Sequence, residues 1–202
     1  MRVPYSKIGR WVAELLLVFV GVYAAFWLSN LQQHHQEAKR RDQILASLER
    51  LLEDGVANTK EQAAKQEREV AEFQRALQVG EMPPLRRFTF TTDYNPSDIA
   101  TLLQAGGIEL LEVRTLTAVR ELESVIRWGL SRMAHYQKLS DELIAPNLDQ
   151  EKIFFYEPSG KELRKRFQIY PEALQEELNF FRELEQKQGQ LLRQIQSERQ
   201  RR

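Results

Sequence analysis

One acidic side chain, Glu14, lies where a long apolar stretch begins, and it has the clearest chemical possibilities in the sequence. No charged residue occurs from Leu15 to Gln36. A carboxylate inside a membrane is costly unless it meets a partner, so Glu14 could pair with a neighbouring helix or exchange protons, as in ion-driven motor stators. Alternatively, Glu14 pairs with Arg10 one turn earlier and reaches the lipid headgroups. Its position close to the end of the apolar stretch favours this second interpretation.

Three small residues, Gly21, Ala25 and Ser29, recur every four positions along the same stretch. They share one helix face, and Glu14, close to two full turns before Gly21, lies on that face too. Small side chains let transmembrane helices approach closely, so the spacing predicts a membrane-association face made of Glu14, Gly21, Ala25 and Ser29. The alternative is that Gly and Ala are simply common in transmembrane helices.

The rest of the sequence offers no comparable group of residues. There is no cysteine, so disulfides and thiolate metal ligands are excluded. His34 and His35 point about 100° apart on a helix and cannot bind one ion from the same face. Gly106-Gly107 lacks the glycine spacing of a phosphate-binding loop, and Glu176-Glu177 is interpreted as part of a solvated helix face. We therefore predict no catalytic residue, no cofactor or metal site and no small-molecule substrate.

Charge narrows the possible partners. The 202 residues include 29 Lys and Arg and 29 Asp and Glu, which gives zero formal charge at pH 7. Nonspecific binding to nucleic acid needs many uncompensated basic residues to neutralise phosphates, so nucleic acid is not an expected partner. The composition is that of an ordered, helix-prone protein.

The apolar stretch that holds the small residues is predicted to cross a membrane. Residues 11–30 provide about 20 residues, or roughly 30 Å of helix, which matches the hydrocarbon core of a bilayer. A cleaved signal peptide is the alternative, but the bulky run Phe26-Trp27-Leu28 stands where a small-residue cleavage site would be needed. Residues 11–30 are therefore predicted to be a retained transmembrane helix, or signal anchor.

Basic residues set the expected orientation of this helix. Arg2, Lys7 and Arg10 precede the span closely, whereas Lys39 is the first basic residue beyond its other end. By the positive-inside rule, residues 1–10 form a short cytoplasmic tail and the rest of the chain lies outside the cytoplasm. In a bacterium with two membranes, this predicts a single-pass protein of the inner membrane with most of its chain in the periplasm.

The anchor also resembles a known family. An acidic residue, Glu14, is followed seven residues later by Gly21 and, at the exit of the span, by Asn30, and the stretch from Leu102 through Gly106-Gly107 reads as a leucine-glycine helix break. These features are similar to those of a bacterial family of single-span membrane proteins of unknown function. The resemblance implies one membrane span followed by a helical extracytoplasmic domain, and it implies no activity and no functional residue.

Residues 31–79 are predicted to form one long membrane-proximal helix, because they contain no proline and a single glycine, Gly55, among helix-forming residues. Their apolar residues recur at alternating steps of three and four, with a four-residue skip, or stutter, before Val56. If unbroken from about Lys7, the helix would run for roughly 70 residues, on the order of 100 Å. This heptad pattern predicts coiled-coil association through Val56, Ala63, Val70 and Phe73.

Residues 80–202 are predicted to form a helical extracytoplasmic domain that packs on the long helix as an antiparallel bundle. Gly80, Pro83 and Pro84 end the long helix. Helices are expected from Pro96, capped by Asn95, to Gly106-Gly107, over about 115–145 and from about 171 onward. Residues 87–92 read as a short extended segment that could pair with residues 153–156, which would be at most a minor two-stranded element in an all-α fold.

These features together predict a membrane-anchored helical interaction or scaffold protein that is not an enzyme. Its expected partners are the lipid bilayer and either further copies of itself or another membrane protein. One alternative is an accessory subunit of a membrane transport or ion-driven complex that uses Glu14 in the membrane. A receptor is a second alternative, weakened because the cytoplasmic tail is too short for an output domain, and an enzyme is a third, disfavoured because no catalytic group of residues is found.

Overall fold

The protein, seen in a computed structural model, is described over residues 5–90 and 96–201, with side chains described from residue 15 onward except at 96–98, 105 and 107. Over this part of the chain the structure consists of helices and connecting segments, without a strand. The predicted all-α class is therefore confirmed. The predicted cap Asn95 lies outside the described residues.

Helix α1 (Tyr5–Gln78) is a single helix of 74 residues, so the predicted long helix is confirmed and begins even earlier in the chain. It ends in a Schellman motif at Gly80, whose φ is +80°. The Glu81 N–H donates to the Ala76 carbonyl at 2.9 Å, and the Gly80 N–H donates to the Leu77 carbonyl at 3.1 Å. Glycine suits this position because a Cβ would be strained at positive φ.

The chain divides into two compact units, residues 1–44 and residues 45–202, and the boundary lies inside α1. The second unit therefore contains the C-terminal part of the helix predicted over 31–79, in addition to residues 80–202. Its further elements are α2 (Pro96–Leu102), the π-helical turn η1 (Leu103–Gly107), α3 (Ile108–Leu110), α4 (Val113–Leu143), the 3₁₀ turns η2 (Ala145–Asn147), η3 (Lys152–Phe155) and η4 (Lys165–Phe167), and α5 (Ile169–Gln200).

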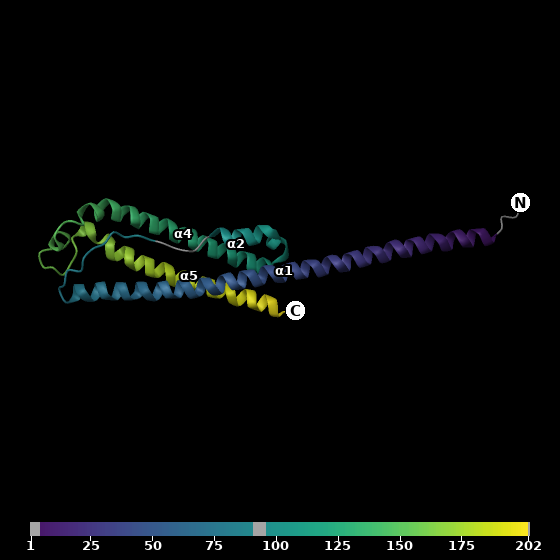
Figure 1. The fold of residues 1–202 in the computed structure, drawn as a ribbon, viewed down its shortest axis with the longest axis horizontal. Helices are drawn as coiled ribbons and strands as arrows, with labels where there is room; N and C mark the ends of the chain where they lie inside the picture. The colour runs from purple at the N-terminus through teal and green to yellow at the C-terminus, as the bar shows by residue number, and fades with distance from the viewer. Residues whose placement is uncertain (1–4, 91–95, 202) are drawn as a thin grey trace. The chain divides into compact units, whose positions relative to one another are not determined.

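Within the second unit, α5 runs antiparallel to both α4 and the C-terminal part of α1 (Figure 1). Helices α1 and α4 run parallel to each other, because the chain between them returns without forming a long helix. Residues 81–90, which we call the crossing segment, make this return along the bundle. The predicted helix break is present within η1, where Gly106 leaves helical geometry.

The suggested pairing of residues 87–92 with residues 153–156 is wrong over the described part of these segments. Residues 152–155 form the turn η3, and the isolated antiparallel bridge joins Tyr156 to Leu163 instead. Because only a tight turn at residues 157–160 separates the two residues, the entropy cost of closing this loop is small. The crossing segment finds other partners, since the Phe88 N–H donates to Ser140 Oγ on α4 at 2.8 Å.

Helices α4 and α5 approach each other closely at one glycine. The Phe180 ring of α5 lies against the backbone of α4 at Gly129, where a Cβ would come within 2.0 Å of the ring. Around this point the two helices bury a continuous apolar stripe that includes Leu122, Ile126, Leu178 and Leu184. The stripe predicted from three- and four-residue spacing in α4 is therefore the face that packs on α5.

We expect Gly129→Ala to lower the free energy of unfolding by about 1–3 kcal/mol, because the new methyl group has no space beside Phe180. Urea unfolding of the detergent-solubilised full chain, followed by circular dichroism, measures this change. Gly189→Ala is the matched control within α5, because a Cβ there meets only the end of the Arg193 side chain, at 3.6 Å. The control should be neutral or stabilising by up to about 1 kcal/mol, and equal effects of the two changes would contradict the close packing.

Candidate functional site

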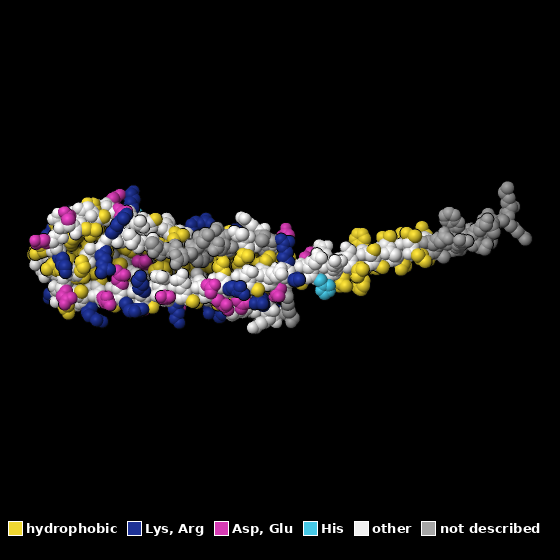
Figure 2. Space-filling model, viewed as in Figure 1, with side chains coloured by type: hydrophobic (Ala, Val, Ile, Leu, Met, Phe, Trp, Pro, Cys, Tyr) yellow, Lys and Arg dark blue, Asp and Glu magenta, His cyan; other side chains and the backbone are white. Residues whose placement is uncertain are grey.

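The N-terminal unit carries an exposed apolar surface, whose contact with water is unfavourable. Every side chain from Leu15 to Leu31 is exposed, including Phe19 at 67%, Tyr23 at 76% and Phe26 at 77%. An 18-residue window of this part of α1 has a mean hydropathy of 1.7. Figure 2 shows these hydrophobic side chains along the visible face of this unit. A helix of this length and composition is able to cross a membrane.

The predicted membrane-association face is exposed where it is described. Gly21, Ala25 and Ser29 are all exposed, and a Cβ built at Gly21 would meet nothing within 4 Å. Space is therefore available at Gly21 for the close approach of another helix. The Glu14 side chain lies outside the described side chains, and its role stays a prediction.

The residues predicted to form a coiled coil are covered by the chain itself. Ala63, Val70 and Phe73 are buried and Val56 is half-buried in the single chain. Phe73 packs on Tyr170 of α5, with ring centroids 5.4 Å apart, and neighbouring Gln66 donates to the Leu174 carbonyl at 3.1 Å. Association of two chains through these residues stays a prediction. In the single chain, the apolar face that the heptad pattern marks on α1 packs against α5.

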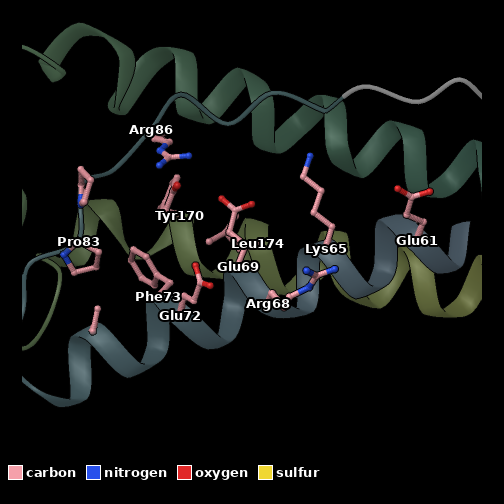
Figure 3. A pocket seen from close by; sticks show the side chains of 12 residues that line it. Glu61, Lys65, Arg68, Glu69, Glu72, Phe73, Pro83, Arg86, Tyr170 and Leu174 are labelled. Atoms are coloured by element: carbon pink, nitrogen blue, oxygen red, sulfur yellow. The ribbon is translucent and has the colours of Figure 1, made fainter. Parts of the chain in front are cut away.

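A groove lies between α1, α5 and the crossing segment. It consists of two adjoining cavities of about 690 Å³ and 210 Å³. Five residues line both cavities: Lys65, Glu69, Arg86, Tyr170 and Leu174. Figure 3 shows Lys65 and Glu69 extending from α1 toward the crossing segment, with Tyr170 beside Arg86. We refer to the two cavities together as the groove.

Contacts along the crossing segment hold the outer wall of the groove in place. The Tyr156 hydroxyl donates to the Pro83 carbonyl at 2.6 Å. The Arg87 guanidinium donates two hydrogen bonds, of 2.5 and 3.0 Å, to the carboxylate of Asp141 on α4. This guanidinium lowers the pKa of Asp141. Phe90 packs against Phe181, with ring centroids 5.9 Å apart. The segment is thus tied to α4, α5 and the turn region even though it has no secondary structure of its own.

Two acidic groups that line the groove, Glu177 and Tyr170, have raised pKa values. Burial, with the nearby Glu69 carboxylate as a second cause, raises the pKa of Glu177 from 4.5 to about 7. Lys65 acts in the opposite direction but does not cancel these effects. Burial and the same Glu69 carboxylate raise the pKa of Tyr170, which therefore stays a neutral hydroxyl. The groove can thus bind or release a proton near neutral pH, and its lining combines charged walls with an apolar floor.

The groove brings together residues that no sequence pattern had indicated. The interpretation of Glu177 as part of a solvated helix face is wrong, because the side chain is half-buried and lines the smaller cavity. The groove residues come from three separate parts of the chain, so no local motif brings them together. The one available signal was that Glu177 lies three residues after Leu174 on the helix face that faces α1.

The histidine side chains do not form a metal-binding group in the described part of the chain. His34, His35 and His135 are exposed, and His34 Nδ1 lies 3.7 Å from the Glu37 carboxylate one turn later. Among the side chains described, no three His, Asp or Glu residues converge on a common point.

We expect Glu177→Gln to stabilise the protein at alkaline pH. The folded chain holds the proton of Glu177 more tightly than the unfolded chain, so the parental protein should lose stability as the pH rises from 4.5 toward 7, with the full loss present above that range. Replacing the carboxyl group by an amide removes the penalty, on the order of 3 kcal/mol at full ionisation. Urea unfolding of both proteins across this pH range measures the difference.

Glu183→Gln serves as the control for this comparison, because Glu183 is an exposed carboxylate of the same helix. This control should leave the pH dependence of stability as it is in the parental chain. A Glu177→Gln protein that is no more stable than the parental chain above neutral pH would contradict the assigned proton affinity.

Comparison with known proteins gives this chain no family assignment: no family model matches it, and neither a curated protein nor a solved structure shows significant similarity to it.

Proposed function

We propose that this chain is a membrane-anchored helical interaction or scaffold protein that acts by association and not by catalysis. The observation that carries the proposal is the exposed apolar surface from Leu15 to Leu31 in a chain whose residues 45–202 form a compact helical unit of their own. Lipid is the environment that removes such a surface from water at no cost in backbone hydrogen bonds, because the helix satisfies its own.

The proposed location is the inner membrane of a bacterium, with the N-terminus in the cytoplasm and residues 31–202 in the periplasm. The basic residues Arg2, Lys7 and Arg10 support this orientation. The absence of cysteine is compatible with an oxidising compartment.

The proposed mechanism is association of the anchors within the membrane. Gly21, Ala25 and Ser29 give one face of α1 a shallow surface on which a second copy of the chain, or another membrane protein, packs closely. The folded second unit would then be presented to partners outside the cytoplasm. The resemblance of the anchor to single-span membrane proteins supports the same organisation without adding an activity.

We expect Gly21→Leu to shift the protein from oligomer toward monomer, because the larger side chain fills the space that the partner helix needs. Chemical crosslinking in native membranes, followed by electrophoresis, measures the shift. Val20→Leu is the matched control, since it enlarges a position about 100° away around the helix. Both variants should stay in the membrane pellet after alkaline extraction.

Equal crosslinking of the parental chain and Gly21→Leu would remove this association face from the proposal. Recovery of the parental chain in the soluble fraction, or of a mature product that begins after Asn30, would overturn the membrane anchor itself.

A second candidate function is that of an accessory subunit of a membrane transport or ion-driven complex. It is favoured by one observation, the acidic residue Glu14 at the start of an uncharged stretch. In this role Glu14 would exchange protons or pair with a basic residue of the partner.

Glu14→Gln separates the two candidate functions. A carboxylate that only reaches the headgroups should tolerate the change, with crosslinking and membrane extraction like those of the parental chain. A proton site should not tolerate it, and growth or transport that depends on the complex should fall while the protein remains in the membrane. An unchanged phenotype would reject the accessory-subunit function.

A further inference from the structure

The last turn of α5 contains a carboxylate that is almost completely buried. Only 2% of Glu198 is exposed, although a glutamate is rarely buried unless it is paired. Both of its oxygens accept hydrogen bonds from α4. Oε2 accepts from the Thr115 hydroxyl at 2.6 Å, and Oε1 accepts from the Glu112 N–H at 3.3 Å. Burying a charge is costly unless hydrogen bonds satisfy it, so these contacts account for a carboxylate at this position.

The start of α4 lacks a cap of its own. Glu112 is the N-cap residue, but its side chain makes no capping hydrogen bond, and the first turn contains no acidic residue. In a capping box, a Glu or Gln at the third helical position accepts the N–H of the N-cap residue. The third helical position of α4 is Thr115, which donates its hydroxyl to Glu198. Glu198 accepts the N-cap N–H instead, so a residue of α5 fills the role that the local sequence of α4 leaves open.

The surroundings of this carboxylate hold it in one arrangement. Thr115 has no exposed surface, and its hydroxyl oxygen accepts a hydrogen bond from Gln194 Nε2 of α5 at 3.0 Å. The hydroxyl therefore receives one hydrogen bond from α5 and returns another to Glu198, and such a chain fixes the direction of each donor. The carboxylate also lies at the N-terminal end of α4, where the helix dipole favours a negative charge.

The next residue along α5 contacts a different helix. Arg199 forms an ion pair with Glu49 of α1, whose side chain is only 17% exposed. Two consecutive residues of α5 thus bind two different helices, Glu198 binding α4 and Arg199 binding α1. Both contacts lie at the end of the second unit where α1 enters it, close to residue 45. At this end, α4 is linked to α1 through the last turn of α5.

We propose that Glu198 caps α4 from α5, and that together with Arg199 it makes the last turn of α5 a clamp on α4 and α1. Helix α4 starts at Val113 because α5 supplies the acceptor. Without Glu198, the Thr115 hydroxyl and the Glu112 N–H would lose that acceptor in a largely buried place. The first turn of α4 would then fray, while the apolar stripe keeps the rest of the helix folded. Glu198 is therefore a positioning residue for this end of the second unit.

Cα chemical shifts measured by NMR on the detergent-solubilised full chain test the cap, because they report the helicity of each residue in the folded state. In Glu198→Ala, we expect the shifts of residues 113–116 to move from helical toward coil values and the shift of Leu130, in the middle of α4, to stay. Unchanged shifts at residues 113–116, or an equal movement at Leu130, would overturn the cap.

A cap placed within α4 itself should rescue this variant. Aspartate is among the preferred N-cap residues, so Glu112→Asp added to Glu198→Ala should return residues 114–116 toward helical shifts. Glu112→Gln is the matched control and should give no such return, because glutamine is not a preferred cap. Failure of Glu112→Asp to restore the shifts, or equal restoration by Glu112→Gln, would contradict a capping role for Glu198.

Two further variants separate the two arms of the clamp. Thr115→Val keeps the shape of the side chain and removes its hydroxyl, so it should fray the same turn and add little in the Glu198→Ala background, since both changes break one hydrogen bond. Arg199→Gln should leave residues 113–116 helical and change the shifts around Glu49. Fully additive effects of Thr115→Val and Glu198→Ala, or fraying of α4 in Arg199→Gln, would overturn the proposed division of roles.

Discussion

Helix α5 buries side chains on two of its faces, and the second unit therefore needs two helices to cover it. One face carries Phe180 against Gly129 of α4, and another carries Tyr170 and Leu174 toward α1. A single partner helix covers only one stripe of such a helix. The C-terminal part of α1 therefore belongs to the folded unit, although the same helix begins as an apolar segment suited to lipid.

The groove follows from how the chain returns between α1 and α4. In a four-helix bundle, a helix would fill this position and bury α5 completely. Here residues 81–90 cross the bundle in extended form, and an extended chain covers less width than a helix. The remaining space becomes the groove, which Glu69 and Glu177 line.

Apolar side chains are covered differently in the two units. In the second unit, apolar side chains are removed from water by α4 and α5, whereas the side chains from Leu15 to Leu31 have no protein partner within the described chain. In the proposed function, lipid would cover these side chains of the N-terminal unit.

The sequence by itself determined the helices, since apolar spacing, helix-forming composition and the stops at Gly80 and Pro83-Pro84 are local properties. It also determined the apolar segment around Gly21, because length and hydropathy suffice for that prediction. Only the tertiary structure decided that Ala63, Val70 and Phe73 are covered by α5 of the same chain, since a heptad pattern states which face is apolar and not what buries it. The tertiary structure also decided that Glu177 is half-buried near Glu69, because burial depends on packing between helices and the second charge comes from a residue more than a hundred positions earlier in the sequence.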